Sequence, residues 1–113
     1  MKVLFIKASE MPKVIEVKND LKPLQDLVGG YIECVRISSN VSLVCNEEGK
    51  LKDLSYNLVL LGSGGENIVD AIFGDCFLIG NDKESGEFTD ISESDIKKYT
   101  NMVKEYGGII LRN

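Results

Sequence analysis

Two apolar runs, YIECVRI (residues 31–37) and VSLVC (residues 41–45), flank the polar tripeptide SSN (residues 38–40). Both runs are rich in β-branched residues, and three polar residues are a common length for the loop of a β-hairpin. The pattern therefore predicts two antiparallel strands over residues 31–45. The other predicted elements lie upstream and downstream of this hairpin in the sequence.

A second hairpin and a helix are predicted upstream of residue 31. Residues 2–8 (KVLFIKA) and 13–18 (KVIEVK) have strand composition and are separated by a break containing Pro12. Asn19 and Asp20 are suitable N-cap residues for a helix, and Leu21, Leu24, Leu27 and Val28 follow at helical spacing. Gly29 and Gly30 end that helix, because glycine adopts the left-handed conformation at low cost.

Downstream, the sequence predicts two more strands and a second helix. Residues 58–61 (LVLL) indicate a buried strand and residues 62–65 (GSGG) a loop, whereas residues 67–72 fit either a helical turn or a strand. Residues 72–80 (IFGDCFLIG) are predicted to form one strand with a bulge at its internal glycine. Ser92 and Asp95 resemble a capping box that opens a helix ending at Gly107, and residues 109–111 fit either a short strand or a tail.

The order of these elements predicts an α+β fold. Strands and helices do not alternate regularly, so a mostly antiparallel sheet is favoured over a parallel one. We expect a single domain over residues 1–113, with two helices (one after the first hairpin and one near the C-terminus) in the same layer against the sheet.

The charge distribution excludes several classes of partner. The net charge is −5, and residues 47–95 carry three basic against twelve acidic side chains. A protein without a basic excess is a poor non-specific binder of nucleic acid and of anionic membranes. The longest apolar run falls far short of the roughly 20 residues that cross a bilayer, and the N-terminus lacks a signal-peptide pattern, so we predict a cytoplasmic protein.

The residue types present argue against catalysis. The chain has no histidine, and Cys34, Cys45 and Cys76 form no CxxC pair, so we expect three buried structural thiols and no metal site. The glycine-rich residues 62–65 are followed by Glu66 and Asn67 in place of the lysine and hydroxyl of a phosphate-binding loop. We predict a non-enzymatic protein that needs no cofactor.

The polar segment from Asn46 to Lys50 leaves two interpretations open. It contains an amide, two carboxylates, a glycine and a lysine within five residues. One interpretation is an Asx turn with solvated charges, and the other is a tight turn that presents its amides to a ligand or partner.

Several of these segments together resemble a known family. Residues 27–33 (LVGGYIE), residues 45–51 (CNEEGKL), Asn57 and residues 72–80 are similar to the motifs of a domain-of-unknown-function family of small proteins from bacteriophages, plasmids and mobile elements. The resemblance covers about residues 1–105, with departures at residues 62–65 and after Gly108. It implies an accessory protein that counters host defence, by sequestering a signalling nucleotide or by occluding a protein.

Two hypotheses follow from the resemblance and the charge pattern. In the first, the protein sequesters a small ligand, with a signalling nucleotide as the candidate, in a pocket or at the interface of a homo-oligomer. The candidate ligand-binding residues are Tyr31 for stacking, Asn46 and Asn57 for polar edges, and Lys50 or Arg36 for phosphate. In the second, an acidic surface docks onto a basic host defence protein, through Glu47, Glu48, Asp75, Asp82, Glu84 and Glu87.

Overall fold

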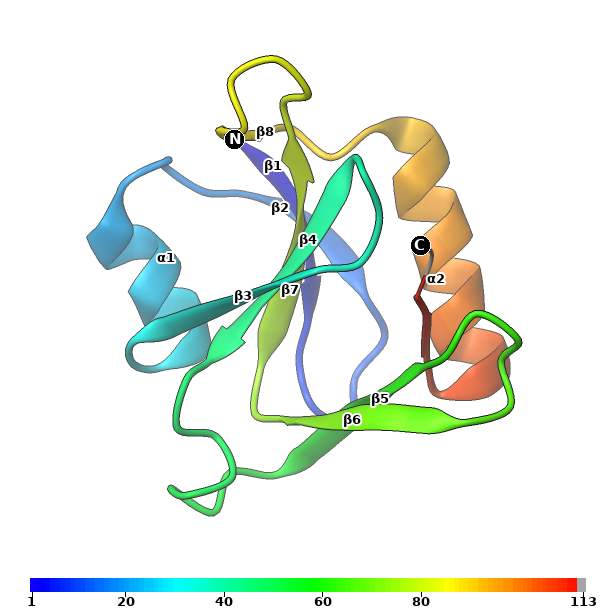
Figure 1. Ribbon diagram of the computed structural model, residues 1–113. Helices are drawn as coiled ribbons and strands as arrows, with labels where there is room; N and C mark the ends of the chain where they lie inside the picture. Colours follow the sequence, from blue (N-terminus) through cyan, green and yellow to red (C-terminus); the bar gives the residue numbers. More distant parts are fainter. Residues whose placement is uncertain (112–113) are drawn as a thin grey trace.

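The computed structural model describes residues 1–111, which form two sheets and two helices (Figure 1). The helices are α1 (Leu21–Val28) and α2 (Glu93–Tyr106). The strands are β1 (Lys2–Ile6), β2 (Lys13–Glu16), β3 (Ile32–Arg36), β4 (Val41–Asn46), β5 (Tyr56–Leu61), β6 (Ile68–Phe73), β7 (Cys76–Asn81), β8 (Phe88–Thr89) and β9 (Gly108–Ile110). Within residues 1–111, neither helix has the length and apolar composition that crossing a bilayer requires.

The larger sheet is antiparallel throughout and confirms both predicted hairpins. Its strand order is β2-β1-β7-β4-β3, with β8 paired beside β7. In the first hairpin Val3 is paired with Ile15, and in the second Cys34 is paired with Val44. The α+β fold with a mostly antiparallel sheet is therefore confirmed.

The smaller sheet has the order β6-β5-β9 and contains a parallel pair, β5 with β9. Residues 67–72, which fitted either a turn or a strand, contribute to strand β6, and the segment after Gly107 is strand β9. The short strand β8 was not among the predicted elements.

The single bulged strand predicted over residues 72–80 is wrong. The segment contains the end of β6 and most of β7, which belong to different sheets, and Gly74 lies in the turn between them with φ +86°. A Cβ on Gly74 would lie 2.7 Å from a methyl carbon of Leu54. The backbone amide of Gly74 donates a hydrogen bond to the carbonyl of Ser55 at 2.6 Å. Glycine is required there because the chain turns sharply while packed against another loop.

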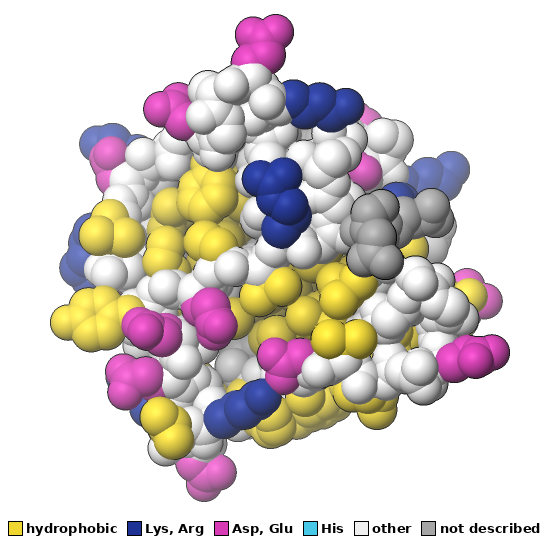
Figure 2. Space-filling view, viewed as in Figure 1, with side chains coloured by type: hydrophobic (Ala, Val, Ile, Leu, Met, Phe, Trp, Pro, Cys, Tyr) yellow, Lys and Arg dark blue, Asp and Glu magenta, His cyan; other side chains and the backbone are white. Residues whose placement is uncertain are grey.

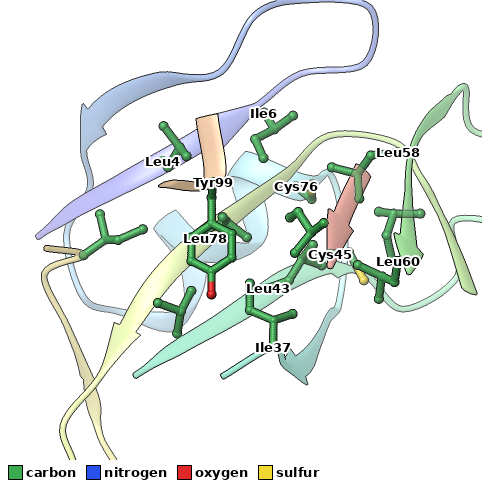
Figure 3. Packing of buried hydrophobic residues seen from close by; sticks show 14 residues of the cluster. Leu4, Ile6, Ile37, Leu43, Cys45, Leu58, Leu60, Cys76, Leu78 and Tyr99 are labelled. Carbon is green, nitrogen blue, oxygen red and sulfur yellow. The ribbon is translucent and has the colours of Figure 1, made fainter. Parts of the chain in front are cut away.

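The two helices lie on opposite faces of the larger sheet, so the prediction that they share one layer is wrong (Figure 1). Every residue of β4 and β7 is buried, which is the pattern of central strands covered on both faces. Val44 and Phe77 face α1 in one core cluster, while Leu43 and Leu78 face α2 and the smaller sheet in the other (Figure 3).

The start of α2 confirms the predicted cap. The Ser92 hydroxyl accepts a hydrogen bond from the Asp95 amide at 3.1 Å, which satisfies one of the free donors of the first turn. Asp20 is the N-cap of α1, although its side chain makes no capping hydrogen bond.

Candidate functional site

The loop between β4 and β5 is organised by the side chain of Asn46. Its Nδ2 donates to the carbonyl of Val28 at 3.1 Å, and its Oδ1 accepts from the amide of Glu48 at 2.8 Å. The second of these bonds is the Asx turn that was one of the two interpretations of this segment. Gly30 allows the close approach, because a Cβ there would lie 2.9 Å from Nδ2 of Asn46. The Asn46 amide therefore links the end of α1 to the loop.

The side chain of Asn57 is likewise used within the protein. Its Nδ2 donates to the carbonyl of Ile6 at 2.9 Å and to the carbonyl of Gly74 at 2.8 Å. These bonds join the end of β1, the start of β5 and the β6–β7 turn. Asn57 thus holds the two sheets together at one end.

A first cleft of about 330 Å³ lies between strands β3 and β4 and the edge of β6. Its walls include the apolar side chains Val35, Cys45 and Ile72. Lys50 Nζ donates to Asp70 Oδ1 at 2.7 Å, and this hydrogen bond raises the pKa of Lys50 and lowers that of Asp70. The lining also contains two further carboxylates, Glu33 and Glu47, so negative charge exceeds positive charge in this cleft.

A second cleft of about 440 Å³ lies beside the C-terminal end of α1. Tyr31, whose side chain is 66% exposed, stands in it together with Lys22, Lys52 and the backbone of Gly29 and Gly30. Gln25 and Asp26 complete the lining. This cleft brings together an exposed aromatic ring and two ammonium groups.

The two lysines of the second cleft were missed by the sequence analysis. Lys22 is paired with Asp26 across one helical turn, and Lys52 Nζ lies 3.8 Å from a carboxylate oxygen of Glu48. A signal for Lys22 was present, because residues 22, 26 and 29 recur at helical spacing and face one side of α1. No such spacing leads to Lys52, since it lies in an irregular loop.

The five predicted ligand-binding residues are therefore not brought together. Tyr31 lines the second cleft, Asn46 and Lys50 line the first, and Asn57 joins the two sheets. Arg36 is exposed on β3 and lines neither cleft. Strand alternation places it on the opposite face from Glu33 and Val35, which line the first cleft.

The acidic residues of the second hypothesis lie at two ends of the larger sheet. Glu47, Glu48 and Asp75 lie at the end where β4 stops and β7 begins, whereas Asp82, Glu84 and Glu87 lie in the loop after β7 (Figure 1). A six-residue strand separates the two groups by about 20 Å. Two of the carboxylates also hold local structure: Asp75 accepts from the Ala8 amide at 3.0 Å, and Asp82 accepts from the Glu84 amide at 2.9 Å.

The prediction of three buried thiols is wrong for Cys34, which is exposed on the edge strand β3. Cys45 and Cys76 are buried as predicted. Burial raises the pKa of the Cys45 thiol to about 11 and raises that of Cys76 further, so both remain protonated and weakly nucleophilic near neutral pH. Among residues 1–111, no cluster of Cys, Asp or Glu is arranged to hold a metal ion.

Comparison with known proteins identifies the family of this chain. Searches of curated proteins and of solved structures found no match. One family model, described as a domain of unknown function (DUF3846), matches residues 1–104 and therefore nearly all of the described fold. The chain belongs to this DUF3846 family.

Proposed function

We propose that this protein is a non-enzymatic binding protein that sequesters a small aromatic anion of the nucleotide class. The observation that carries the proposal is the second cleft, where the exposed Tyr31 ring lies beside Lys22 and Lys52. An aromatic platform next to cationic groups suits a ligand with a planar base and a phosphate.

The first cleft supports this assignment less well. Among residues 1–111, the only basic side chain in its lining is Lys50, which already donates to Asp70, and the other charged side chains there are carboxylates. A phosphate would meet net repulsion at that cleft, whereas in the second cleft Lys22 and Lys52 balance the two carboxylates paired with them, Asp26 and Glu48.

The expected contribution of Tyr31 can be stated in advance. Stacking of a base on an aromatic side chain is worth about 1–3 kcal/mol, which corresponds to a loss of roughly 5- to 150-fold in affinity when the ring is removed. Lys52→Ala would weaken binding further and reduce its dependence on salt, because dissolved ions screen the attraction between an ammonium group and a phosphate.

The test is native mass spectrometry followed by calorimetric titration with cyclic and ADP-ribose-type nucleotides. Tyr31→Ala is compared with Tyr106→Ala, whose ring is also exposed but lies at the end of α2, outside the cleft. We expect one nucleotide to bind, to be released unchanged, and to lose affinity only with Tyr31→Ala. Conversion of the nucleotide overturns the non-enzymatic assignment, and equal effects of both variants overturn the site.

The role against host defence is part of the same proposal and is supported only by the resemblance to small proteins of phages and mobile elements. Co-expression with a nucleotide-signalled defence system tests it: the wild-type chain is expected to suppress the response, and Tyr31→Ala is not. If no nucleotide binds, the search moves to host proteins that contact the acidic residues.

A further inference from the structure

Two buried cysteines, Cys45 on β4 and Cys76 on β7, belong to the same core cluster (Figure 3). The register of these two strands ends with Val44 opposite Phe77, and the next position along it places Cys45 opposite Cys76. Residues that lie opposite each other in neighbouring antiparallel strands have their side chains on the same face of the sheet. The pairing of β4 with β7 therefore brings the two thiols together.

Cys45 and Cys76 form the closer of the two kinds of antiparallel pair. The amide of Asn81 donates to the carbonyl of Asn40, its partner when the same register is continued, at 2.7 Å. Hydrogen-bonded and non-hydrogen-bonded pairs alternate along an antiparallel ladder, so the cysteines, an odd number of positions further on, form a non-hydrogen-bonded pair. The Cα atoms of such a pair lie about 4.5 Å apart. This separation is within the range of roughly 4.4–6.8 Å that disulfides span.

The surroundings of Cys76 agree with this placement. The Asn57 side chain that joins the two sheets also reaches the thiol, because its Nδ2 lies 3.7 Å from the Cys76 sulfur. Burial raises the pKa of Cys76, and the neighbouring Cys45 raises it further. The second effect requires the two sulfurs to lie within electrostatic reach of each other.

Cys45 can be reached from the surface, whereas Cys76 cannot. Cys45 lines the first cleft and is 5% exposed, and Cys76 has no exposed surface. Figure 2, viewed as in Figure 1, shows hydrophobic side chains between β3 and β6 with acidic side chains beside them. A small uncharged oxidant can enter a cleft of this kind, whereas an anionic oxidant such as oxidised glutathione is repelled by the excess of carboxylates.

We infer that Cys45 and Cys76 are a site of intramolecular disulfide formation, driven by a small uncharged peroxide that enters the first cleft. Hydrogen peroxide transfers one oxygen to the sulfur of Cys45, which gives a sulfenic acid and one water. The sulfur of Cys76 then attacks that of Cys45, so the S–S bond forms and the S–O bond breaks. The departing hydroxyl leaves with the Cys76 proton as a second water. The two thiols together lose two electrons and two protons, and the peroxide is reduced to water.

The pH dependence of this reaction follows from the burial of Cys45. The thiolate is the form that reacts, and the pKa of Cys45 is raised to about 11, so the reaction is slow near neutral pH. Its rate is expected to rise about tenfold for each pH unit below that pKa.

The test treats the full chain carrying Cys34→Ser with hydrogen peroxide at mildly alkaline pH. Cys34 is removed because it is exposed and would form disulfides between chains. Remaining thiols are alkylated in denaturant, and the chain is digested without reductant and analysed by mass spectrometry. We expect a pair of peptides linked through Cys45 and Cys76, lighter than their sum by two hydrogen atoms, from a chain that stays monomeric on a non-reducing gel. Dithiothreitol is expected to reverse the link, and oxidised glutathione is expected to form it far more slowly.

Two further variants in the same background separate the roles of the two thiols. Cys76→Ala is expected to stop at the sulfenic acid of Cys45, which dimedone traps. Cys45→Ala is expected to leave Cys76 unmodified, because that thiol has no exposed surface. Circular dichroism of both variants checks that they are folded, and the test of the parent chain needs neither of them.

Four outcomes would overturn the inference. These are free Cys45 and Cys76 after a treatment that fully oxidises Cys34 in the wild-type chain, a link that forms only in urea, links between chains, and oxidation of Cys76 in folded Cys45→Ala. None of them depends on nucleotide binding at Tyr31, so the inference and the proposed function can fail separately.

Discussion

Substituting Tyr99 by phenylalanine is expected to stabilise the protein. The Tyr99 side chain is fully buried in the core between α2 and the larger sheet, and Figure 3 shows its hydroxyl among hydrocarbon side chains. Its oxygen has no hydrogen-bond partner within residues 1–111. A buried hydroxyl in this state has lost its bonds to water without replacement, at a cost of about 1–3 kcal/mol.

The expected gain in the free energy of unfolding is smaller than that cost. Phenylalanine keeps the ring and its contacts but leaves a small void where the oxygen was, so we expect a net gain of about 1 kcal/mol. Tyr99→Ala removes the ring as well and is expected to lower the free energy of unfolding by about 3–5 kcal/mol, as for other large aromatic side chains in cores. The two variants separate the contribution of the ring from that of the hydroxyl.

Urea unfolding, followed by circular dichroism, measures both changes. The midpoint should rise for Tyr99→Phe with no change in the dependence on urea, which would show that the compactness of the two states is unaltered. Tyr106→Phe, at an exposed position, is the control and should change stability by less than about 0.5 kcal/mol. A loss of more than about 1 kcal/mol on Tyr99→Phe would refute the reasoning, because it would mean that the hydroxyl is hydrogen-bonded.

Four further predictions concern the loops and thiols. Asn57→Ala removes two hydrogen bonds and is expected to lower the free energy of unfolding by about 2 kcal/mol, whereas Asn101→Ala on the exposed face of α2 should have little effect in the same urea titration. Gly49→Ala should destabilise by at least about 1 kcal/mol, measured in the same way, because its Cβ would lie 2.6 Å from a backbone oxygen of β6. A thiol reagent at pH 8 should modify Cys34 before Cys45, detected by mass spectrometry after digestion. The pKa of Cys45 is about 11 in the folded state against an ordinary 9.0, so the folded state keeps this proton over a pH range in which the unfolded state loses it. The free energy of unfolding should therefore fall between pH 9 and 11. A free energy of unfolding that does not change over this range would contradict the burial of this thiol.

The local elements of the fold were predictable because their signals are local. The β3–β4 hairpin follows from two apolar runs and a short polar loop, and the start of α2 follows from the spacing of Ser92 and Asp95. The β6–β7 boundary was missed because the turn at Gly74 depends on packing against Leu54, twenty residues earlier. The placement of the helices on opposite faces could have been inferred from β4 and β7, since strands with apolar residues in both directions require cover on both sides.

The candidate site was less predictable, because a sequence shows which groups are present but not which partners they have. Asn46 and Asn57 carry amides suited to reading a ligand, yet both are engaged by backbone carbonyls of distant segments. Lys50 was chosen over Lys52, although the two are only two residues apart. In the structure Lys50 is paired with Asp70 in the first cleft, whereas Lys52 lines the second cleft together with Tyr31.

Net charge is therefore a poor guide to where this protein would bind an anion. Charges act over about 8 Å at physiological ionic strength, which is much less than the length of the six-residue strands that separate the acidic groups. The field at Tyr31 is set mainly by Lys22, Lys52 and their paired carboxylates, Asp26 and Glu48, and the acidic loop after β7 contributes little to it. At low salt the electrostatic repulsion from that distant acidic loop is screened less and acts over a longer distance. A nucleotide bound at Tyr31 would therefore gain less affinity from low salt than its two lysine contacts alone would provide. Neutralising Asp82, Glu84 and Glu87 together should restore the full salt dependence while leaving affinity near physiological salt unchanged.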